Sequence, residues 1–477
     1  MNGLRILACL TLWVCSCVVA SAAPAFDCSR PGLEAFAAVC ADRELAGLDR
    51  AMDNILVRLG TGDKLTTMLL RRAQRWFFDA LGVKYKNKFT RADDPERQRI
   101  LEAMQDRMKL LEGLASNAAR GLAGRWVNTF SEAKLEALDS GTIRITVTNK
   151  ATDATDDDTT CNAVAQVKPD RDGWLAGMAT RIVDDDPPAA GDPADSPFRL
   201  RLRLQGNTLR IVLMPSEMDS FCGVPEQITG SYFLVAAAEP RSGLPAAVVS
   251  PSFSCATAKL PDEEEICGDP DLAARDVEIA QAYRDIQRKL EAKTFGFLRD
   301  DQRAWAKDNA VAFDANLLPA WDKQFTERHH TGNARNELLL RQNERLAMLT
   351  NLEPARQGFT GLWLANNALL IIKADPEKPG NLSATGRKWQ SGDYKAHCDF
   401  EADGKIVGGT FRSDDSFPQL ALDGVTLTVD GRDPDRTRGN RRLRDQPIYC
   451  TRMDSAKVRL FPVKPHPDID QSDGRIR

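Results

Sequence analysis

Apolar residues recur at helical spacing in two separate stretches of the chain. Leu45, Met52 and Leu59 mark one helix face, and Leu272 and Ile279 begin a similar face about 227 residues later. Asp269 before Pro270 is a suitable N-cap for the second of these helices, and Asp42 begins the first. Similar spacing predicts further helices over 68–81, 96–114, 297–313 and 336–352. Each stretch is therefore expected to form a small group of helices.

The period changes to strict alternation after each helical stretch. Residues 198–204 alternate apolar and basic side chains, and a turn at 205–207 leads into the apolar run 208–213. In the second half, 420–422 and 425–429 flank Asp423-Gly424, a dipeptide typical of tight hairpins. We therefore expect two antiparallel sheets, each closed as a small barrel or packed as a sandwich.

The two halves share an order of landmarks that indicates a tandem duplication. A Phe-x-Cys triplet precedes a second cysteine by twelve residues at Cys28 and Cys40, and again at Cys255 and Cys267; Gly-x-x-Gly-x-Trp follows at 121–126 and 358–363. The predicted class is α+β, with two tandem modules that each contain a disulfide-braced small helical domain followed by an antiparallel β barrel or sandwich. The predicted segments are a helical domain at 26–118, a β domain at 119–238, a linker at 239–252, a helical domain at 253–354 and a β domain at 356–465.

The N-terminus has the pattern of a secretory signal peptide. Arg5 is followed by an apolar stretch that ends at the small residues Ala20-Ser21-Ala22, and this stretch is short for a membrane span. Cleavage after residue 22 is favoured over lipid anchoring at Cys17, because Cys15 is unusual just before the small residue of an acylation site. The mature chain is therefore expected in the periplasm of a bacterium, or secreted or at the cell surface, without a transmembrane segment.

Eight cysteines remain after the signal peptide, and they divide equally between the two modules. An even number in a repeated order is typical of an oxidising compartment. The duplication favours local bridges, and we predict the disulfides Cys28–Cys40, Cys161–Cys222, Cys255–Cys267 and Cys398–Cys450. The alternative is metal binding, but no cysteine pair has the close spacing of a zinc site and the chain has only 4 histidines. No metal or other cofactor is expected.

Charge and motifs argue against several functional classes. The formal net charge of −4 is that of a chain without a dedicated nucleic-acid surface. The sequence has no Gly-x-Ser-x-Gly, phosphate loop, dinucleotide fingerprint or His-Glu-x-x-His. We expect a protein that is not an enzyme. A hydrolase whose carboxylates the sequence does not single out is the remaining enzymatic alternative.

Two pairs of charged residues lie on otherwise apolar helix faces. Asp49 and Arg107 are such a pair in the first module, and Asp276 and Arg345 are their counterparts in the second. A carboxylate and a guanidinium on neighbouring helices can form a bidentate ion pair. We predict the pairs Asp49–Arg107 and Asp276–Arg345, with the role of fixing helix register.

The second β domain carries a basic insertion that the first lacks. The segment between Gly424 and Cys450 is longer than its counterpart and holds several arginines, among them Arg436, Arg438, Arg441 and Arg442. A solvated hairpin tip is one interpretation. The other is an arm that binds the acidic surface of a partner, such as an anionic glycan, a lipid headgroup or an acidic protein.

The second helical stretch contains Phe253-Ser254-Cys255, Glu264 to Cys267, Asp271 to Asp276, Ala282-Tyr283 and Gln302 to Trp305, and the first contains Phe26, Cys28, Cys40, Leu48-Asp49 and Gln74-Arg75. In these residues the second stretch, and more faintly the first, bears a resemblance to the N-terminal domain of LprI-type lysozyme inhibitors. It implies an exported helical domain whose partner is lysozyme or another cell-wall hydrolase, inhibited by steric blocking of the cleft. The alternative is an envelope structural or interaction protein that binds peptidoglycan or membrane partners without inhibiting lysozyme. The β domains remain unassigned.

Overall fold

The structure is a computed structural model of the 477-residue chain. It describes residues 39–59, 64–84, 94–114, 122–138, 141–149, 162–182, 198–213, 228–237, 248–317, 334–390, 393–413, 419–430 and 458–469. The chain divides into two compact units. One consists of Met1–Val57 and Leu81–Glu112, and the other of Arg58–Ala80 and Gly113–Arg477.

The first unit contains most of α2 (Arg43–Leu59) and all of α4 (Pro95–Glu112). Helix α2 buries Leu45, Met52 and Ile55 on one face, and α4 buries Ile100 and Met104. This burial follows the helical spacing of the apolar residues. The predicted helices at 68–81 and 96–114 are confirmed as α3 (Lys64–Lys84) and α4. Most of α3 belongs to the second unit.

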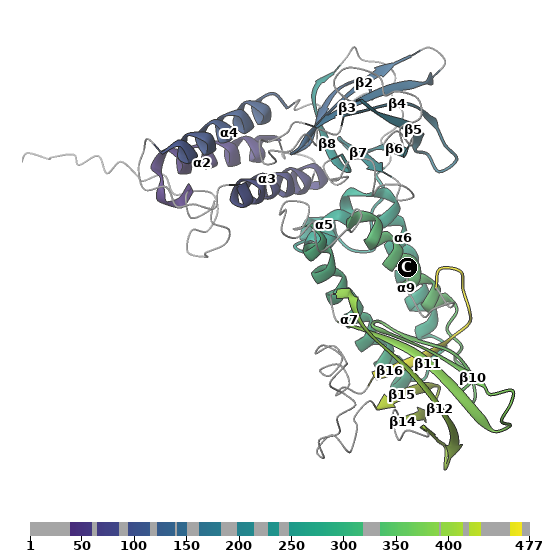
Figure 1. Ribbon diagram of the computed structural model, residues 1–477. Helices are drawn as coiled ribbons and strands as arrows, with labels where there is room; N and C mark the ends of the chain where they lie inside the picture. Colours follow the sequence, from purple (N-terminus) through teal and green to yellow (C-terminus); the bar gives the residue numbers. More distant parts are fainter. Residues whose placement is uncertain are drawn as a thin grey trace, which may run out of the picture. The chain divides into compact units, whose positions relative to one another are not determined.

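The first β domain of the second unit is a closed barrel of eight antiparallel strands (Figure 1). In chain order the strands are β1 (Gly124–Val127), β2 (Ser131–Ala137), β3 (Ile143–Asn149), β4 (Asn162–Pro169), β5 (Leu175–Ile182), β6 (Phe198–Gln205), β7 (Thr208–Leu213) and β8 (Gly230–Ala237). Each strand pairs with the next, and β8 returns to pair with β1. Alternate side chains, including Trp126, Ile145, Leu200, Leu202 and Tyr232, fill the interior.

In the described part of the chain, the helices that follow are α5 (Pro261–Gly268), α6 (Pro270–Gln287), α7 (Ala292–Leu317) and α9 (Ala334–Thr350). A short 3-10 turn, η5 (Cys255–Thr257), comes before them. The predicted Cys255–Cys267 disulfide is present and ties this turn to α5. The predicted helices at 297–313 and 336–352 are confirmed as α7 and α9.

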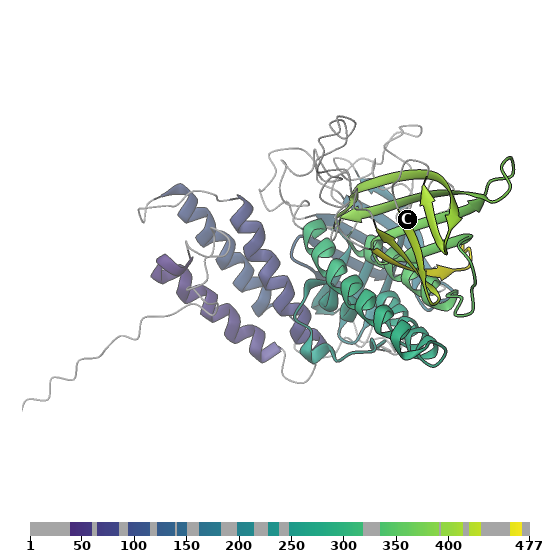
Figure 2. The same ribbon diagram turned by 90° about the horizontal axis from the view of Figure 1, so that it is seen from below.

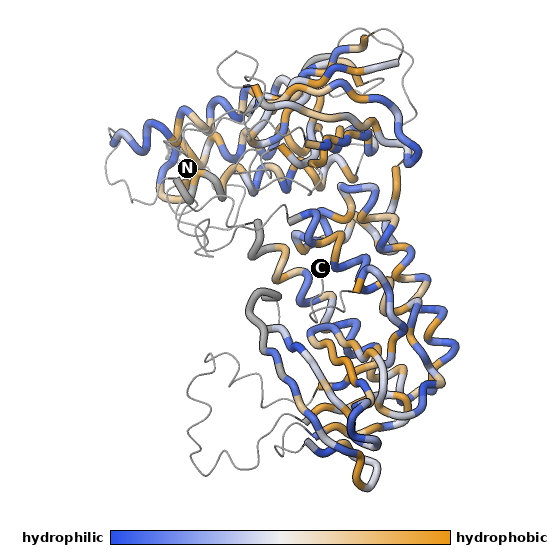
Figure 3. Tube along the Cα trace, turned by 45° about the vertical axis from the view of Figure 1, so that its right-hand side comes forward, coloured by the Kyte–Doolittle hydropathy of each residue, from blue (hydrophilic) through white to orange (hydrophobic). Residues whose placement is uncertain are grey.

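A second closed barrel of eight antiparallel strands completes the fold. Its strands are β9 (Gly361–Ala365), β10 (Ala368–Ala374), β11 (Asn381–Gln390), β12 (Asp393–Val407), β13 (Thr410–Ser413), β14 (Gln419–Asp423), β15 (Thr426–Asp430) and β16 (Val458–Val463). The predicted hairpin at Asp423-Gly424 is confirmed as the β14–β15 turn. Trp363, Leu370 and Phe411 lie in the apolar interior, and apolar and polar residues alternate along many of the strands (Figure 3). The architecture is thus α+β, with barrels where the sequence left barrel or sandwich open.

The outside of the second barrel packs on the helices that precede it. Leu362, Leu364 and Phe461 share an apolar cluster with Ile286 of α6 and Met348 of α9. Figures 1 and 2 show these helices as a group beside the barrel. In the described part of the chain, no helix is both long enough and apolar enough to span a membrane.

The Gly-x-x-Gly-x-Trp motif has the same local structure in both barrels. The indole Nε1 of Trp126 donates to the Leu122 carbonyl at 2.9 Å, and that of Trp363 donates to the Phe359 carbonyl at 2.7 Å. The second glycine of each motif has a positive φ, 147° at Gly124 and 124° at Gly361. In each barrel, the motif therefore places a buried tryptophan in the first strand and bonds its indole to the turn that leads into that strand.

Candidate functional site: two arginine-clamped helix starts

The start of α6 is held by a carboxylate and a guanidinium. Asp269 Oδ1 accepts hydrogen bonds from the backbone N–H groups of Asp271 (3.0 Å) and Leu272 (3.2 Å), as a helix N-cap does. Arg335, in the first turn of α9, donates from Nε and Nη2 to the two carboxylate oxygens of Asp269, at 2.9 and 3.0 Å. Its Nη2 also reaches Asp271 Oδ2 at 3.0 Å. We call Asp269, Asp271 and Arg335 the second clamp.

The start of α2 is held in the same way. Asp42 Oδ1 accepts from the N–H groups of Glu44 (2.9 Å) and Leu45 (3.1 Å). Arg97, in the first turn of α4, donates from Nε and Nη2 to the two oxygens of Asp42 at 2.6 and 3.1 Å, and from Nη2 to Glu44 Oε2 at 2.7 Å. The hydrogen bond from Arg97 lowers the pKa of Asp42. Asp42, Glu44 and Arg97 form the first clamp, and it repeats the second bond for bond.

The first barrel covers the second clamp. Arg210 of β7 donates from Nε to Asp269 Oδ2 at 3.0 Å, and Arg201 of β6 donates from Nη1 to Asp271 Oδ2 at 3.2 Å. Trp174, just before β5, donates its indole N–H to Asp271 Oδ1 at 3.0 Å. The side chain of Asp269 is 0% exposed and that of Arg210 is 1% exposed. Each carboxylate of this clamp therefore receives a donor from the barrel.

Two neighbouring acidic residues of α5 extend the buried charge cluster to α3. Glu265 accepts from Arg72 Nη1 at 2.7 Å and also from Arg210, while Glu264 accepts from Arg75. Burial alone would raise the pKa of Glu265, but Arg210 and Arg72 more than offset this and lower it. Burial acts likewise on Asp269, whose pKa Arg335 and Arg210 bring far below its usual range. Both carboxylates are therefore charged at neutral pH, and the arginines are their counter-ions.

Gly268 lets these elements approach one another closely. A Cβ atom at Gly268 would lie 2.9 Å from Leu69 Cδ2 of α3 and 3.3 Å from Ser231 Oγ of β8. Ala41 occupies the same place before Asp42 in the first module and is exposed. The methyl group of Ala41 is thus accommodated because this position is exposed, whereas Gly268 is in close contact with α3 and β8.

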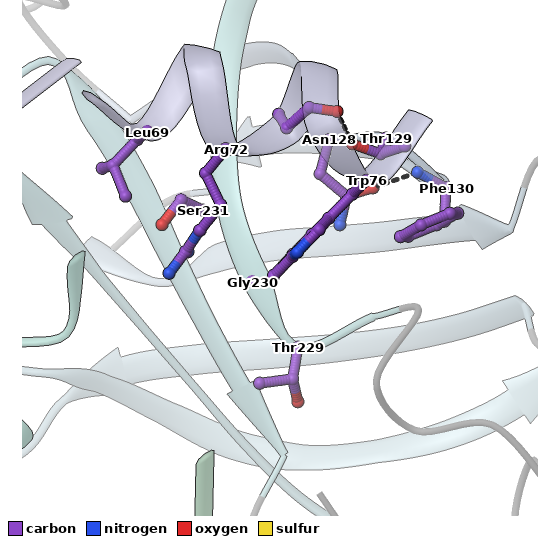
Figure 4. Close-up of a pocket in the computed structure, with 10 residues that line it drawn as sticks. Leu69, Arg72, Trp76, Asn128, Thr129, Phe130, Thr229, Gly230 and Ser231 are labelled. Carbon is purple, nitrogen blue, oxygen red and sulfur yellow. Dashed lines mark hydrogen bonds between the residues drawn. The ribbon is translucent and has the colours of Figure 1, made fainter. Parts of the chain in front are cut away.

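A small pocket lies between α3 and the rim of the first barrel (Figure 4). Arg72 stacks over the Trp76 ring at 4.8 Å on one wall. On another wall, Asn128 Oδ1 accepts from the Phe130 N–H at 2.7 Å and Thr129 Oγ1 donates to the Ala73 carbonyl at 3.1 Å. The Thr129 bond attaches α3 to the β1–β2 turn, and the Asn128 bond holds the turn itself. At the second barrel, Asp301 of α7 likewise accepts from the N–H of Asn366 in the β9–β10 turn, at 2.8 Å.

The predicted Asp276–Arg345 pair is wrong. Arg345 donates from Nη1 to Asp301 Oδ2 and from Nε to Gln302 Oε1, both at 2.7 Å, and both acceptors belong to α7. Asp276 Oδ2 accepts from the Ser252 N–H at 2.6 Å. The apolar stripes predicted that both side chains face the helical core. However, Arg345 meets a carboxylate of α7 there. Asp276 lies at the edge of its stripe, beside the segment that precedes the helices.

The other predicted site residues have different outcomes. Asp49 and Arg107 are both buried, at 3% and 6% exposure, and burial lowers the pKa of Arg107 to about 10; their mutual pairing stays a prediction. Cys40 is disulfide-bonded. Cys398 lies in β12, but its side chain is outside the described residues. Also outside them are Cys28, Cys161, Cys222, Cys450, Arg436, Arg438, Arg441 and Arg442.

The arginines of both clamps were not predicted from the sequence. Arg97 is 55 residues from Asp42 and Arg335 is 66 residues from Asp269, so no local period links them. The basic face of residues 198–204 was a usable signal for Arg201, because a strand that alternates leucine and arginine needs an acidic neighbour wherever its polar face is covered.

Two buried acidic residues, Asp262 of α5 and Glu344 of α9, should make the stability depend on pH in the direction opposite to the carboxylates of the clamps. Burial raises the pKa of Asp262 to about 6 from an ordinary 3.8, and burial together with Glu337 raises the pKa of Glu344. A raised carboxyl pKa favours the folded state fully below the ordinary pKa, and this stabilisation is lost as pH rises through the folded value. We expect the melting temperature to fall by a few degrees between pH 5 and 7. Asp262→Asn should reduce this fall, and Asp300→Asn, at an exposed position, should leave it intact.

Among the described residues, no three His, Cys, Asp or Glu side chains are grouped as metal ligands would be. In comparisons with known proteins, the chain matches no family model, no curated protein and no solved structure.

Proposed function

We propose that the protein is an exported, non-enzymatic binding protein that inhibits lysozyme or a related cell-wall hydrolase by sterically blocking its cleft. The observation that supports binding most directly is the filling of both barrels. Trp126 and Leu202 in the first barrel, and Trp363 and Leu370 in the second, belong to continuous apolar cores. Apolar side chains of the described strands thus occupy both barrel interiors, which supports recognition at the outer surface and turns.

The proposal treats the chain as two tandem modules, each with its own disulfide-braced helical domain and a barrel. The matching clamps and the matching entry tryptophans support this division. The resemblance of the helical stretches to the LprI-type inhibitor domain suggests the hydrolase as partner. The Cys255–Cys267 disulfide is compatible with the oxidising compartment that a signal peptide implies, namely the periplasm or the cell surface.

The β12–β13 turn is the candidate contact surface. Ile406 and Val407 are 47% and 42% exposed, and the turn closes through Gly408 and Gly409 at φ 60° and 78°. Two glycines in this conformation make a tight hairpin turn. In the first barrel the corresponding β4–β5 turn is engaged, because Trp174 at its end bonds to Asp271. The second barrel therefore presents two exposed apolar side chains at a hairpin tip.

The test is a turbidity assay of cell-wall lysis by c-type lysozyme. The oxidised protein lacking residues 1–22 is added in increasing amounts. We expect dose-dependent protection of the cell walls and a complex with lysozyme on a sizing column. Full lysis at large molar excess, with no complex, contradicts inhibition. Retention of the protein on purified peptidoglycan in that case favours the envelope-binding alternative.

Variants locate the contact surface. We expect Ile406→Ser with Val407→Ser to weaken protection at least tenfold if the hairpin tip enters the cleft. Val311→Ser is the matched control, since Val311 is 49% exposed on α7. Replacement of Arg436, Arg438, Arg441 and Arg442 by alanine tests the basic insertion separately. Loss of protection in this variant alone would transfer the contact from the hairpin tip to the insertion.

A further inference from the structure

The two clamps share their internal bonds but differ in what covers them. In the second clamp, Arg210 donates to Asp269, and Arg201 and Trp174 both donate to Asp271. Among the described residues of its own compact unit, the first clamp receives no further side-chain donor beyond Arg97. The same set of bonds is thus covered by a barrel in the second clamp and has no such cover within the first unit.

The charge of the first clamp is correspondingly unbalanced. Each clamp contains two carboxylates and one guanidinium, so each alone has a formal excess of one negative charge. In the second clamp the two barrel arginines more than offset this excess, and Arg210 also pairs with Glu265. In the first, the Glu44 side chain is 56% exposed and that of Asp42 is 18% exposed, against 27% for Asp271 and 0% for Asp269. A carboxylate with this exposure is accessible to a guanidinium from outside.

In its described strands, the second barrel of another copy of this chain lacks the complementary face. The β6–β7 and β14–β15 turns match closely, because Thr208 Oγ1 donates to the Gln205 carbonyl and Thr426 Oγ1 to the Asp423 carbonyl, each at 2.8 Å. In this register the second barrel carries Gln419 and Thr428 in place of Arg201 and Arg210. By strand pairing, Thr410 stands in place of Trp174. The first barrel of a second copy is already engaged with its own second clamp.

We propose that the first clamp is a docking site for another protein that presents two arginines from neighbouring β-strands. The partner's guanidinium groups would bind Glu44 and Asp42 as Arg201 and Arg210 bind Asp271 and Asp269. Arginine suits this role better than lysine because its planar fork matches a carboxylate at two points. Ala41 in place of Gly268 requires a partner that leaves room for a methyl group. This site is independent of the proposed inhibition of lysozyme.

The probe for this site is a fluorescent cyclic hairpin with the sequence of residues 198–213. Added terminal cysteines close it, and threonines replace the leucines of its apolar face. We expect it to bind the full-length protein, with changes in anisotropy, and to slow hydrogen exchange at the Glu44 and Leu45 amides. Glu44→Gln should weaken binding at least tenfold. Asp106→Asn, the same charge change at an exposed position of the same unit, should change it less than twofold.

Three results would overturn the proposal. They are equal binding of a hairpin with lysine in place of both arginines, equal weakening by Asp106→Asn, and absence of binding at millimolar probe. Because Glu44 is more than half exposed, Glu44→Gln is expected to fold, which an unchanged melting curve verifies. Sedimentation of the chain alone adds a further check: a dimer that Glu44→Gln abolishes would identify a second copy as the occupant and contradict the proposed partner.

Discussion

Replacing Arg335 with alanine should destabilise the second unit by about 3–5 kcal/mol, because the buried Asp269 carboxylate would lose its main counter-ion. Arg210 remains at 3.0 Å, but it is shared with Glu265. The measurement is urea unfolding at pH 7, with hydrogen exchange of the α6 amides to locate the loss. Several transitions are expected from a chain of this size, so exchange at named amides is more informative than one midpoint.

The first clamp supplies the matched control for this prediction. Arg97→Ala removes the same bonds from Asp42 and Glu44, yet water reaches both carboxylates once Arg97 is gone, and we expect a loss of about 1 kcal/mol. The difference between the two variants measures what the barrel adds by excluding water. Equal losses from Arg335→Ala and Arg97→Ala would contradict the assignment of the second clamp as a buried charge centre.

Replacing Trp363 with alanine should destabilise the second barrel by about 3–5 kcal/mol, because the side chain is 1% exposed at the centre of its core. Trp363→Phe keeps most of the buried ring but loses the hydrogen bond to the Phe359 carbonyl. We expect this variant to cost about 1–2 kcal/mol. Urea unfolding followed by far-UV circular dichroism measures both effects.

The half-buried Trp305 serves as the control for Trp363. Its ring contacts the Arg345 guanidinium at 5.8 Å, and Trp305→Phe should cost about 0.5 kcal/mol. Trp126→Ala should affect the first barrel as Trp363→Ala affects the second, since both indoles make the same bond. Similar values for Trp363→Ala and Trp305→Phe would mean that the tryptophan does not organise the barrel core.

The sequence predicted those features that depend on neighbours along the chain. Helical spacing located α3, α4, α7 and α9, and a turn dipeptide located the β14–β15 hairpin. Barrel closure was not predictable in this way. It depends on β8 returning to β1 and β16 to β9, and these pairings join strands that are far apart in the sequence.

The candidate site was only half predictable for the same reason. Asp42 and Asp269 were recognisable as helix starts because an N-cap acts on the next few residues. Their guanidinium partners come from helices that are distant in the sequence. The helical spacing predicts which face of a helix a side chain lies on, but not which residue it binds. Arg345 illustrates the error: it was expected at Asp276 and instead binds Asp301. An arginine is long enough to choose among several carboxylates, so tertiary packing decides the pair.

Barrel closure restricts how a partner can recognise this protein. Every strand in the two barrels has a bonded neighbour on both sides, so neither sheet offers a free edge. A partner therefore cannot extend either sheet by adding a strand of its own, which is a common way of binding extended peptides. The same closure removes the edges through which sheets aggregate. Recognition at the barrels must therefore come from side chains and turns.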